Sequence, residues 1–114
     1  MKMTDIDAAA HAISAVDDSA AMASRVGEAT ALLKALAHDG RLSILCHLSS
    51  GERGVGELEA LLGQRQATVS QQLARLREEG LVTSRAEGKQ RLYAIADPRA
   101  AEVVGLLHRM FCTR

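Results

Sequence analysis

Large aromatic side chains and proline are nearly absent from this chain of 114 residues, which has one tyrosine, one phenylalanine, no tryptophan and one proline. A core without large rings has to be built from closely packed Leu, Ala, Val and Ile side chains, which favours helices. Also missing are an apolar run long enough to cross a bilayer and the continuous apolar segment of a signal peptide. We therefore expect a mainly helical, cytoplasmic protein that makes no membrane contact.

Motifs typical of enzymes are missing as well. The sequence has no Ser-His-Asp arrangement, no phosphate-binding loop and no paired carboxylates, and its two cysteines, Cys46 and Cys112, do not form a Cys-x-x-Cys motif. These absences argue against an enzyme. Two alternatives stay open on the sequence alone, namely a small thiol enzyme that uses the cysteine pair and a module that only binds other proteins.

The segment from Gly56 to Ile95 has the pattern of a helix-turn-helix followed by a β-hairpin. A short apolar helix is predicted to end at Gly63, and a second helix to begin at residue 67 or 68 and to end at Gly80, because glycine readily takes the left-handed conformation that ends a helix. Alternating residues on both sides of Gly88-Lys89 predict two strands joined by a tight turn. Two helices joined by a short turn, with a hairpin behind them, form a winged DNA-binding unit.

The second helix of this unit and the hairpin carry the candidate DNA contacts. Val69, Leu73 and Leu76 recur at helical spacing and are expected to pack inward, which leaves polar side chains for base edges and phosphates. The free N–H groups at the start of the helix suit a phosphate oxygen. The predicted contacts with double-stranded operator DNA are Gln66, Thr68, Ser70, Gln71, Gln72 and Arg75 on or near the helix, and Arg85, Lys89 and Arg91 on the hairpin.

Charge is distributed unevenly along the chain, although the formal net charge is zero. Residues 65–91 contain six basic and three acidic side chains, whereas residues 1–64 contain five basic and nine acidic ones. Phosphate contacts supply much of the affinity for DNA, so a cluster of basic charge on the winged unit fits a nucleic-acid partner.

Three further helices are predicted around this unit. They cover residues 20–37 and 39–50 and the segment from Pro98 to the chain end, where Asp97 supplies the cap. The last helix has an apolar surface too wide for one contact, which predicts that it also packs against a second copy of the chain. The length fits one domain over residues 17–114, after an extension over residues 1–16 that is either weakly helical or disordered. The predicted fold class is mainly α with a small β-hairpin, a winged helix-turn-helix in the order α-α-α-α-β-β-α.

Two stretches, Leu36–Leu45 and Thr68–Leu76, closely resemble the ArsR/SmtB family of winged-helix repressors, and the resemblance extends over residues 25–112. The resemblance implies a homodimer that is paired through its first and last helices. It also implies that this dimer binds operator DNA and releases it when an inducer reaches a sensing site.

The metal sites of that family have no counterpart in this sequence. The stretch Glu52–Leu58 has no cysteine where sensors of soft metals carry thiols, and the positions of the zinc ligands hold Asp97, Arg99, Met110 and Thr113. This set does not supply the nitrogen and oxygen ligands that such a site needs. The four histidines, His11, His38, His47 and His108, show no ligand spacing. We therefore expect neither a metal nor another cofactor.

The two cysteines are the remaining candidates for a sensing site. Cys46 is predicted on the inward stripe of the helix over residues 39–50, and Cys112 near the end of the last helix. Two unrelated buried cysteines are the simplest interpretation. Positive charge from His108, Arg109 and Arg114 favours a Cys112 thiolate, whereas the negative end of the helix dipole opposes it, and the sequence does not decide between them.

Within the resemblance, this pair is similar to that of the subgroup of repressors that senses reactive sulfur species (BigR- and SqrR-like). The resemblance implies that a persulfide or polysulfide inducer causes Cys46 and Cys112 of one protomer to be bridged by a disulfide or a short polysulfide. One thiolate would attack sulfane sulfur and the other would resolve the product. A sensor of peroxide or disulfide stress that uses the same two thiols is the rival interpretation.

Overall fold

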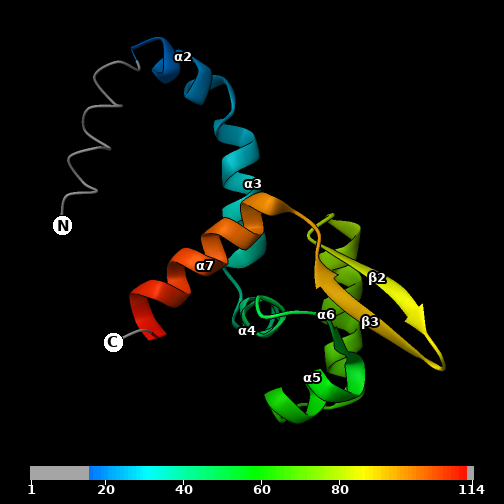
Figure 1. Ribbon diagram of the computed structural model, residues 1–114. Coiled ribbons are helices and arrows are strands. Elements are labelled where there is room, and N and C mark those ends of the chain that lie inside the picture. Colours follow the sequence, from blue (N-terminus) through cyan, green and yellow to red (C-terminus); the bar gives the residue numbers. More distant parts are fainter. Residues whose placement is uncertain (1–15, 113–114) are drawn as a thin grey trace. The chain divides into compact units, whose positions relative to one another are not determined.

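The computed structural model, drawn in Figure 1, describes residues 16–112. The chain divides into two units, with the boundary in the sequence between Leu33 and Lys34. The first unit contains α2 (Val16–Ser24) and most of α3 (Val26–Leu36). Residues 1–15 of the predicted extension lie outside the described residues. The domain boundary predicted after residue 16 falls at the edge of the described part and stays a prediction.

The helix predicted over residues 20–37 is interrupted at Arg25, so the prediction of one continuous helix is wrong. The Ser24 hydroxyl donates to the carbonyl of Ala21 over 2.8 Å, and the Arg25 N–H donates to the carbonyl of Met22 over 2.9 Å. A serine hydroxyl that bonds a carbonyl of the preceding turn competes with the helical pattern. The result is a turn between α2 and α3.

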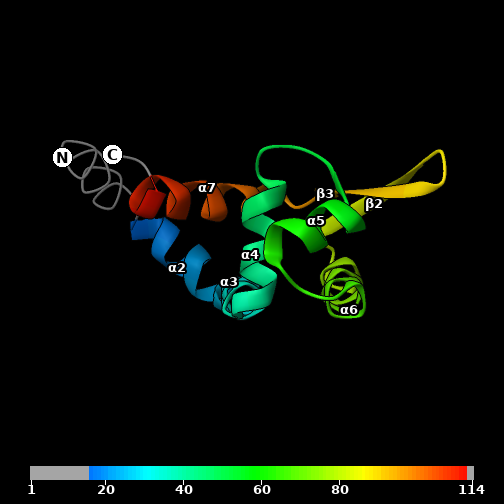
Figure 2. The same cartoon turned by 90° about the horizontal axis from the view of Figure 1, so that it is seen from below.

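The second unit is a winged helix-turn-helix, which confirms the predicted fold class. Its elements, after the end of α3, are α4 (Asp39–Leu48), β1 (Arg53–Gly54), α5 (Val55–Leu62), α6 (Gln66–Glu78), β2 (Val82–Glu87), β3 (Gln90–Ile95) and α7 (Pro98–Cys112). Helices α5 and α6 form the helix-turn-helix. Strands β2 and β3 extend beyond the helices as the wing, which Figure 2 shows with α6 seen along its axis.

The core of this unit is aliphatic, as the lack of aromatic residues predicts. Its largest fully buried side chains are Ile44, Leu45, Leu58, Val69, Leu73, Leu76 and Val104. The three predicted inward positions of α6 are among them. Among the described residues, none of the helices combines the length and the apolar character that crossing a membrane requires.

The sheet has three antiparallel strands in the order β1-β3-β2, one more than the predicted hairpin. The wing register runs from Val82 opposite Ile95 to Glu87 opposite Gln90, around a turn in which Gly88 has a φ of +61°. Strand β1 has only two residues, too few to show an alternating pattern in the sequence.

The helix ends follow from local hydrogen bonding. Gly63 and Gly80 have φ values of +65° and +76°, which confirms the predicted ends of both helix-turn-helix helices. Helix α6 begins at Gln66, one or two residues before the predicted start, because Arg65 already has an extended conformation. Helix α4 ends at Leu48, two residues before the predicted end, since the hydroxyls of the next two residues donate to carbonyls of its last turn.

Candidate DNA-reading surface and thiol pair

Helix α6 presents a polar face opposite its buried stripe. Five of its six predicted DNA contacts are exposed, namely Gln66, Thr68, Ser70, Gln71 and Arg75. Arg65 precedes the helix, and no side chain caps this end. The first N–H groups of an α-helix have no partner within the helix, so this end is suited to a phosphate oxygen.

The sixth predicted contact, Gln72, is half-buried and faces the first turn of α4. A Cβ atom built on Gly40 would lie 3.1 Å from Nε2 of Gln72, which is tighter than most such contacts. Glycine at position 40 therefore lets the two helices approach closely at this point. Gln72 packs between helices, unlike the exposed polar residues of the same face.

Glu79, which directly follows α6, connects this helix to α4. Its Oε2 lies 3.5 Å from Nε of Arg75 and 3.6 Å from Nη1 of Arg41. The side chain of Arg41 is only 14% exposed, whereas that of Arg75 is 64% exposed. Sequence reasoning missed this role of Glu79, although its spacing of four residues from Arg75 is the usual spacing of a helical ion pair.

The basic residues of the wing differ in whether they are paired with carboxylates. Arg85 donates to both oxygens of Glu52, over 2.8 and 2.9 Å, and to Glu87 over 2.6 Å. These hydrogen bonds lower the pKa of the Glu52 carboxyl and raise that of the Arg85 guanidinium. Lys89 and Arg91 are exposed, and the ion pairs found among residues 16–112 include neither of them.

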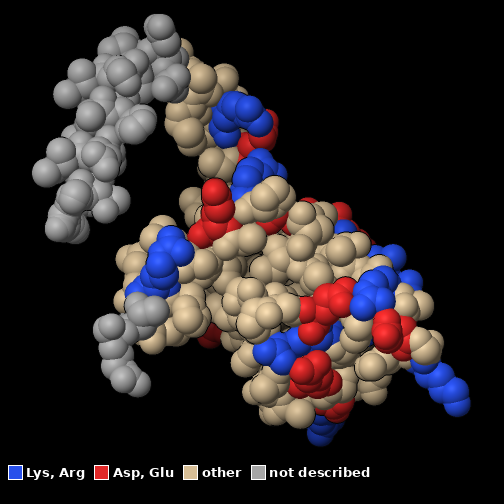
Figure 3. Space-filling model, in the orientation of Figure 1, with Lys and Arg blue, Asp and Glu red and all other residues tan. Residues whose placement is uncertain are grey.

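Charges of both signs consequently alternate over the base of the wing, while a basic side chain projects from its tip (Figure 3). Glu52 lies 33 residues from Arg85 in the sequence, and no local pattern indicates such a pair. The assignment of Arg85 to DNA contact stays a prediction, as do those of Lys89 and Arg91.

Cys46 and Cys112 lie on two helices that pack together, α4 and α7. Cys46 is half-buried, two positions before the end of α4, and Cys112 is exposed in the last turn of α7. Both are free thiols. Cys46 was predicted to point inward, and its side chain is only partly buried. Cys112 is the more solvent-exposed of the two thiols.

The surroundings of Cys46 affect its ionisation. Burial raises the pKa of the Cys46 thiol above that of an ordinary cysteine, and negative charge on Cys112 raises it further. A thiol is nucleophilic as the thiolate, so the raised pKa makes Cys46 the weaker attacking group at neutral pH. The arrangement suits a reaction that begins at Cys112 and is completed by Cys46.

Metal ligands do not gather in the described part of the chain. Over residues 16–112, no group of three or more His, Cys, Asp or Glu side chains is placed to hold a metal ion. His38 precedes α4 without capping it through its side chain, His47 is half-buried and His108 is exposed on α7. His11 and Thr113 lie outside the described residues.

Known proteins identify the family. The model of the "Bacterial regulatory protein, arsR family" matches residues 38–84, which span α4 to the start of β2. The biofilm growth-associated repressor of Agrobacterium fabrum is 50% identical over 92 residues, which cover 81% of this chain and 79% of that protein. The chain belongs to the arsR family.

Solved structures of arsR-type folds agree with this assignment. Reduced HlyU from Vibrio cholerae superposes with a TM-score of 0.77 at 40% identity, over 81% of this chain and 97% of HlyU. The homodimeric winged helix-turn-helix DNA-binding domain Mb0332 from Mycobacterium bovis has a TM-score of 0.64 at 35% identity, over 82% of this chain and 84% of that domain. Regulators of this family bind DNA and form homodimers, and they are not enzymes.

Proposed function

We propose that this arsR-family regulator is a repressor that binds operator DNA as a reduced homodimer and releases it when reactive sulfur species bridge Cys46 to Cys112. The observation that carries the proposal is the placement of two free thiols on α4 and α7, two helices that pack together. The two thiols lie on different helices of one protomer, so a bond between them ties α4 to α7.

The homodimer is supported by apolar side chains that the single chain leaves exposed. On α7, the side chains of Leu106, Met110 and Phe111 are 47%, 62% and 78% exposed. Exposed apolar groups that follow one another along a helix mark a surface for protein contact. A second copy of the chain, paired through this helix, covers them, and the relative named after its homodimeric domain supports this partner.

The chemistry uses a persulfide, R–S–SH, as the oxidant. The Cys112 thiolate attacks the outer sulfur, a Cys112 persulfide forms, and the thiolate R–S⁻ leaves with the electron pair and takes up a proton. The Cys46 thiolate then attacks Sγ of Cys112 and expels HS⁻, which leaves a disulfide. In total, two thiols are oxidised, and the persulfide is reduced to a thiol and hydrogen sulfide.

A longer bridge follows from the same steps. If a second persulfide molecule first converts Cys46 to its persulfide, the terminal sulfur of that group attacks Sγ of Cys112. Loss of HS⁻ then leaves a trisulfide between the two residues.

Release of DNA follows from a change at the dimer interface. A dimer of this type places its two reading helices in consecutive major grooves, roughly 34 Å apart. A bridge that ties α7 to α4 restrains the helix proposed to pair the protomers, and so changes the spacing of the two α6 helices. A hundredfold loss of affinity requires only about 2.8 kcal/mol.

The test measures operator binding and intact mass on the same samples. Reduced protein should bind a roughly palindromic duplex, and persulfide treatment should cross-link Cys46 to Cys112 within one chain and weaken binding. Cys46→Ser and Cys112→Ser proteins should bind DNA when reduced and stay bound after treatment. Release of DNA by the treated Cys112→Ser protein would rule out the two-thiol mechanism.

The rival is a sensor of peroxide or disulfide stress that uses the same thiols through a sulfenic acid. The exposed position of Cys112 favours this alternative as well as the persulfide reaction. Added sulfur in the intact mass identifies reactive sulfur species, because peroxide produces only a simple disulfide. If both reagents produce the simple disulfide, the reagent that releases the operator at the lower concentration distinguishes the two. A module that only binds proteins would fail to shift any operator duplex.

A further inference from the structure

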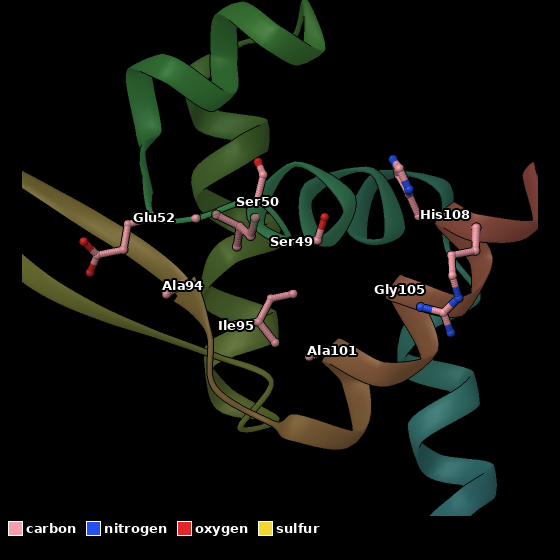
Figure 4. A pocket seen from close by; sticks show the side chains of 11 residues that line it. Ser49, Ser50, Glu52, Ala94, Ile95, Ala101, Gly105 and His108 are labelled. Atoms are coloured by element: carbon pink, nitrogen blue, oxygen red, sulfur yellow. The ribbon is translucent and has the colours of Figure 1, made fainter. Parts of the chain in front are cut away.

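A hollow of about 700 Å³ opens between the end of α4, the end of β3 and α7. Figure 4 shows Ser49 and Ser50 on its α4 side, Ile95 from β3, and Gly105 and His108 along α7. A space of this size admits a small organic molecule. The hollow therefore gives a reagent room to lie beside α7.

Cys112 lies on the side of α7 that faces this hollow. The lining residues Gly105 and His108 are three positions apart, and Cys112 follows His108 by four. Residues three or four apart share one side of an α-helix, so these three form one stripe. Leu106 and Met110, which we assign to the pairing surface, lie on another side of the helix. A reagent in the hollow consequently reaches the Cys112 thiol past the imidazole of His108.

Both charged residues that line the hollow already have partners. The carboxylate of Glu52 points away from the hollow and accepts hydrogen bonds from Arg85 through both oxygens (Figure 4). Arg109 is engaged in an interaction as well. The exposed imidazole of His108, in contrast, has no hydrogen bond or ion pair with any residue between 16 and 112. Its ring nitrogens are therefore open to the neighbouring thiol.

A thiol in the last turn of a helix has to ionise in unfavourable surroundings. The last carbonyl groups of an α-helix lack partners within the helix and disfavour a negative charge nearby. The thiolate is the nucleophile, yet an ordinary cysteine is mostly protonated at neutral pH. An imidazole is the side chain best suited to take such a proton. Residues four apart on a helix have Cβ atoms roughly 5–6 Å apart, so rotation of the two side chains brings a ring nitrogen to the sulfur.

We propose that His108 is the acid–base partner of Cys112 in the reaction with persulfides. The neutral imidazole takes the proton of the Cys112 thiol, and the thiolate attacks the outer sulfur of R–S–SH. The bond between the two sulfurs of the reagent breaks, R–S⁻ leaves with the electron pair, and the imidazolium gives the proton to it. The products are a Cys112 persulfide, R–SH and a neutral imidazole. The proposal rests on the sensing function proposed above, whose sulfur transfer it leaves unchanged.

Few other groups near this pair change charge at neutral pH. The charged and titratable groups that face it are Cys46 and His47 on α4, Glu52 with its partner Arg85, and Arg109 on α7 itself. Strand β3 lines the hollow only with residues that cannot ionise. Arginines keep their charge, and Glu52 does too, because Arg85 lowers the pKa of its carboxyl. With Cys46 replaced by serine, His47 is the other titrating group in this part of the described structure, so His47→Gln is the matched control.

The first experiment tests proton acceptance without any sulfur reagent. Iodoacetamide alkylates Cys112 in a Cys46→Ser protein, and the rate is followed by mass spectrometry over about pH 5–10 in that protein and in its His108→Gln and His47→Gln derivatives. His108→Gln should slow the reaction about tenfold at neutral pH and leave only the rise at alkaline pH, where the thiol ionises without help. His47→Gln should keep the original profile. Superposable profiles with and without His108 overturn the proposal. His108 is exposed, so glutamine should leave the fold intact, which circular dichroism checks.

The second experiment measures how fast glutathione persulfide consumes reduced protein that has both thiols. At each pH, the rate for the unsubstituted protein is divided by that for His108→Gln, which cancels the ionisation of the persulfide itself. The ratio should peak near neutral pH at about tenfold, and approach unity where the imidazole is protonated or the thiol ionises unaided. The corresponding ratio for His47→Gln should stay flat.

The outcomes separate this proposal from the sensing function. A flat ratio for His108→Gln, with intact bridging of Cys46 to Cys112, overturns only the role of His108. Failure of the unsubstituted protein to form the bridge with persulfide overturns the sensing function, and this proposal with it.

Discussion

Arg75 and Arg85 are both basic residues of the winged unit, but their surroundings differ. All three guanidinium nitrogens of Arg85 bond to Glu52 or Glu87, and the pair with Glu52 is bidentate. Arg75 has one long ion pair with Glu79 and is mostly exposed. An exposed single ion pair contributes little, whereas a bidentate pair is stronger. Arg75 therefore transfers to DNA more readily than Arg85.

The exposed polar residues of α6 give the first prediction. Arg75→Ala and Gln71→Ala should each weaken operator binding by about 1–3 kcal/mol, because each removes a side chain that is proposed to contact a base edge. Arg85→Ala should weaken it less, since that side chain is already bonded within the wing. Fluorescence anisotropy with operator and scrambled duplexes measures both affinities. Unchanged operator affinity in Gln71→Ala and Arg75→Ala would show that another element reads the bases.

The wing tip gives the second prediction. Lys89→Ala and Arg91→Ala should lower affinity for operator and scrambled DNA alike, and each should reduce the slope of log affinity against log salt by about one. Lys34→Ala, which removes the same charge from α3, serves as the control. A larger loss on the operator than on scrambled DNA would assign these residues to base reading.

The thiol pair gives a prediction about pH. The pKa of Cys46 is raised by burial and by charge on Cys112, so its thiolate, and its alkylation by iodoacetamide, should appear only at higher pH than for an ordinary cysteine. Cys112→Ser removes the charge but not the burial. The midpoint for Cys46 should therefore move to lower pH in that variant while staying above the ordinary value. Mass spectrometry of the alkylated Cys46 peptide follows the titration, and identical midpoints in both proteins would show that the thiols do not interact.

At the scale of elements, the local sequence pattern predicts most of the fold. Gly63, Gly80 and the Gly88 turn are recognisable because each ends an element by a conformation that glycine favours. The break at Arg25 and strand β1 were not predicted. The break depends on one serine hydroxyl, and the strand depends on its pairing with Tyr93 and Leu92, far along the chain.

The candidate site also combines features that the local sequence predicts with features that depend on distant contacts. The polar face of α6 follows from helical spacing, whereas the Glu52–Arg85 pair arises only when distant segments meet. The position of Gln72 against Gly40 likewise depends on how α4 and α6 approach, which no single helix encodes.

The cap of α7 gives a prediction about stability. Asp97 accepts the Arg99 N–H over 2.8 Å, so Asp97→Ala should cost about 1 kcal/mol of unfolding free energy. The matched variant Asp97→Asn keeps an accepting oxygen and should cost less. Urea denaturation followed by circular dichroism measures both, and equal losses in the two variants would show that the cap itself contributes nothing.

Asp97 also makes the stability of the protein depend on pH. Arg99 lowers the pKa of Asp97 in the folded protein. The unsubstituted protein should therefore have its full advantage in unfolding free energy over Asp97→Asn at pH values above the ordinary carboxyl pKa. It should be lost as the pH falls through the lowered pKa of the folded state. An advantage that grows on acidification would contradict this assignment.

At the scale of the whole molecule, dimer formation gives the last prediction. Met110→Glu places a charge on the exposed apolar face of α7 and should shift the dimer toward monomer and weaken operator binding together. Leu61→Glu changes a residue of α5 that is also about half exposed, at 47%, and should leave the oligomeric state unchanged. Sedimentation equilibrium measures the assembly. Equal dissociation by the two variants would argue against α7 as the pairing helix.

Helix α4 contacts the helix that is proposed to read DNA and carries one of the two thiols that are proposed to sense sulfur species. Its first turn meets α6 through Gly40 and, by way of Arg41, Glu79, while Cys46 lies near its other end. Ten residues of helix measure about 15 Å, and a packed helix shifts as a rigid body within microseconds to milliseconds. Formation of a disulfide takes seconds or longer. If the proposed function holds, the delay between exposure to reactive sulfur and release of the operator is set by the sulfur chemistry, and transmission through the protein adds almost nothing to it.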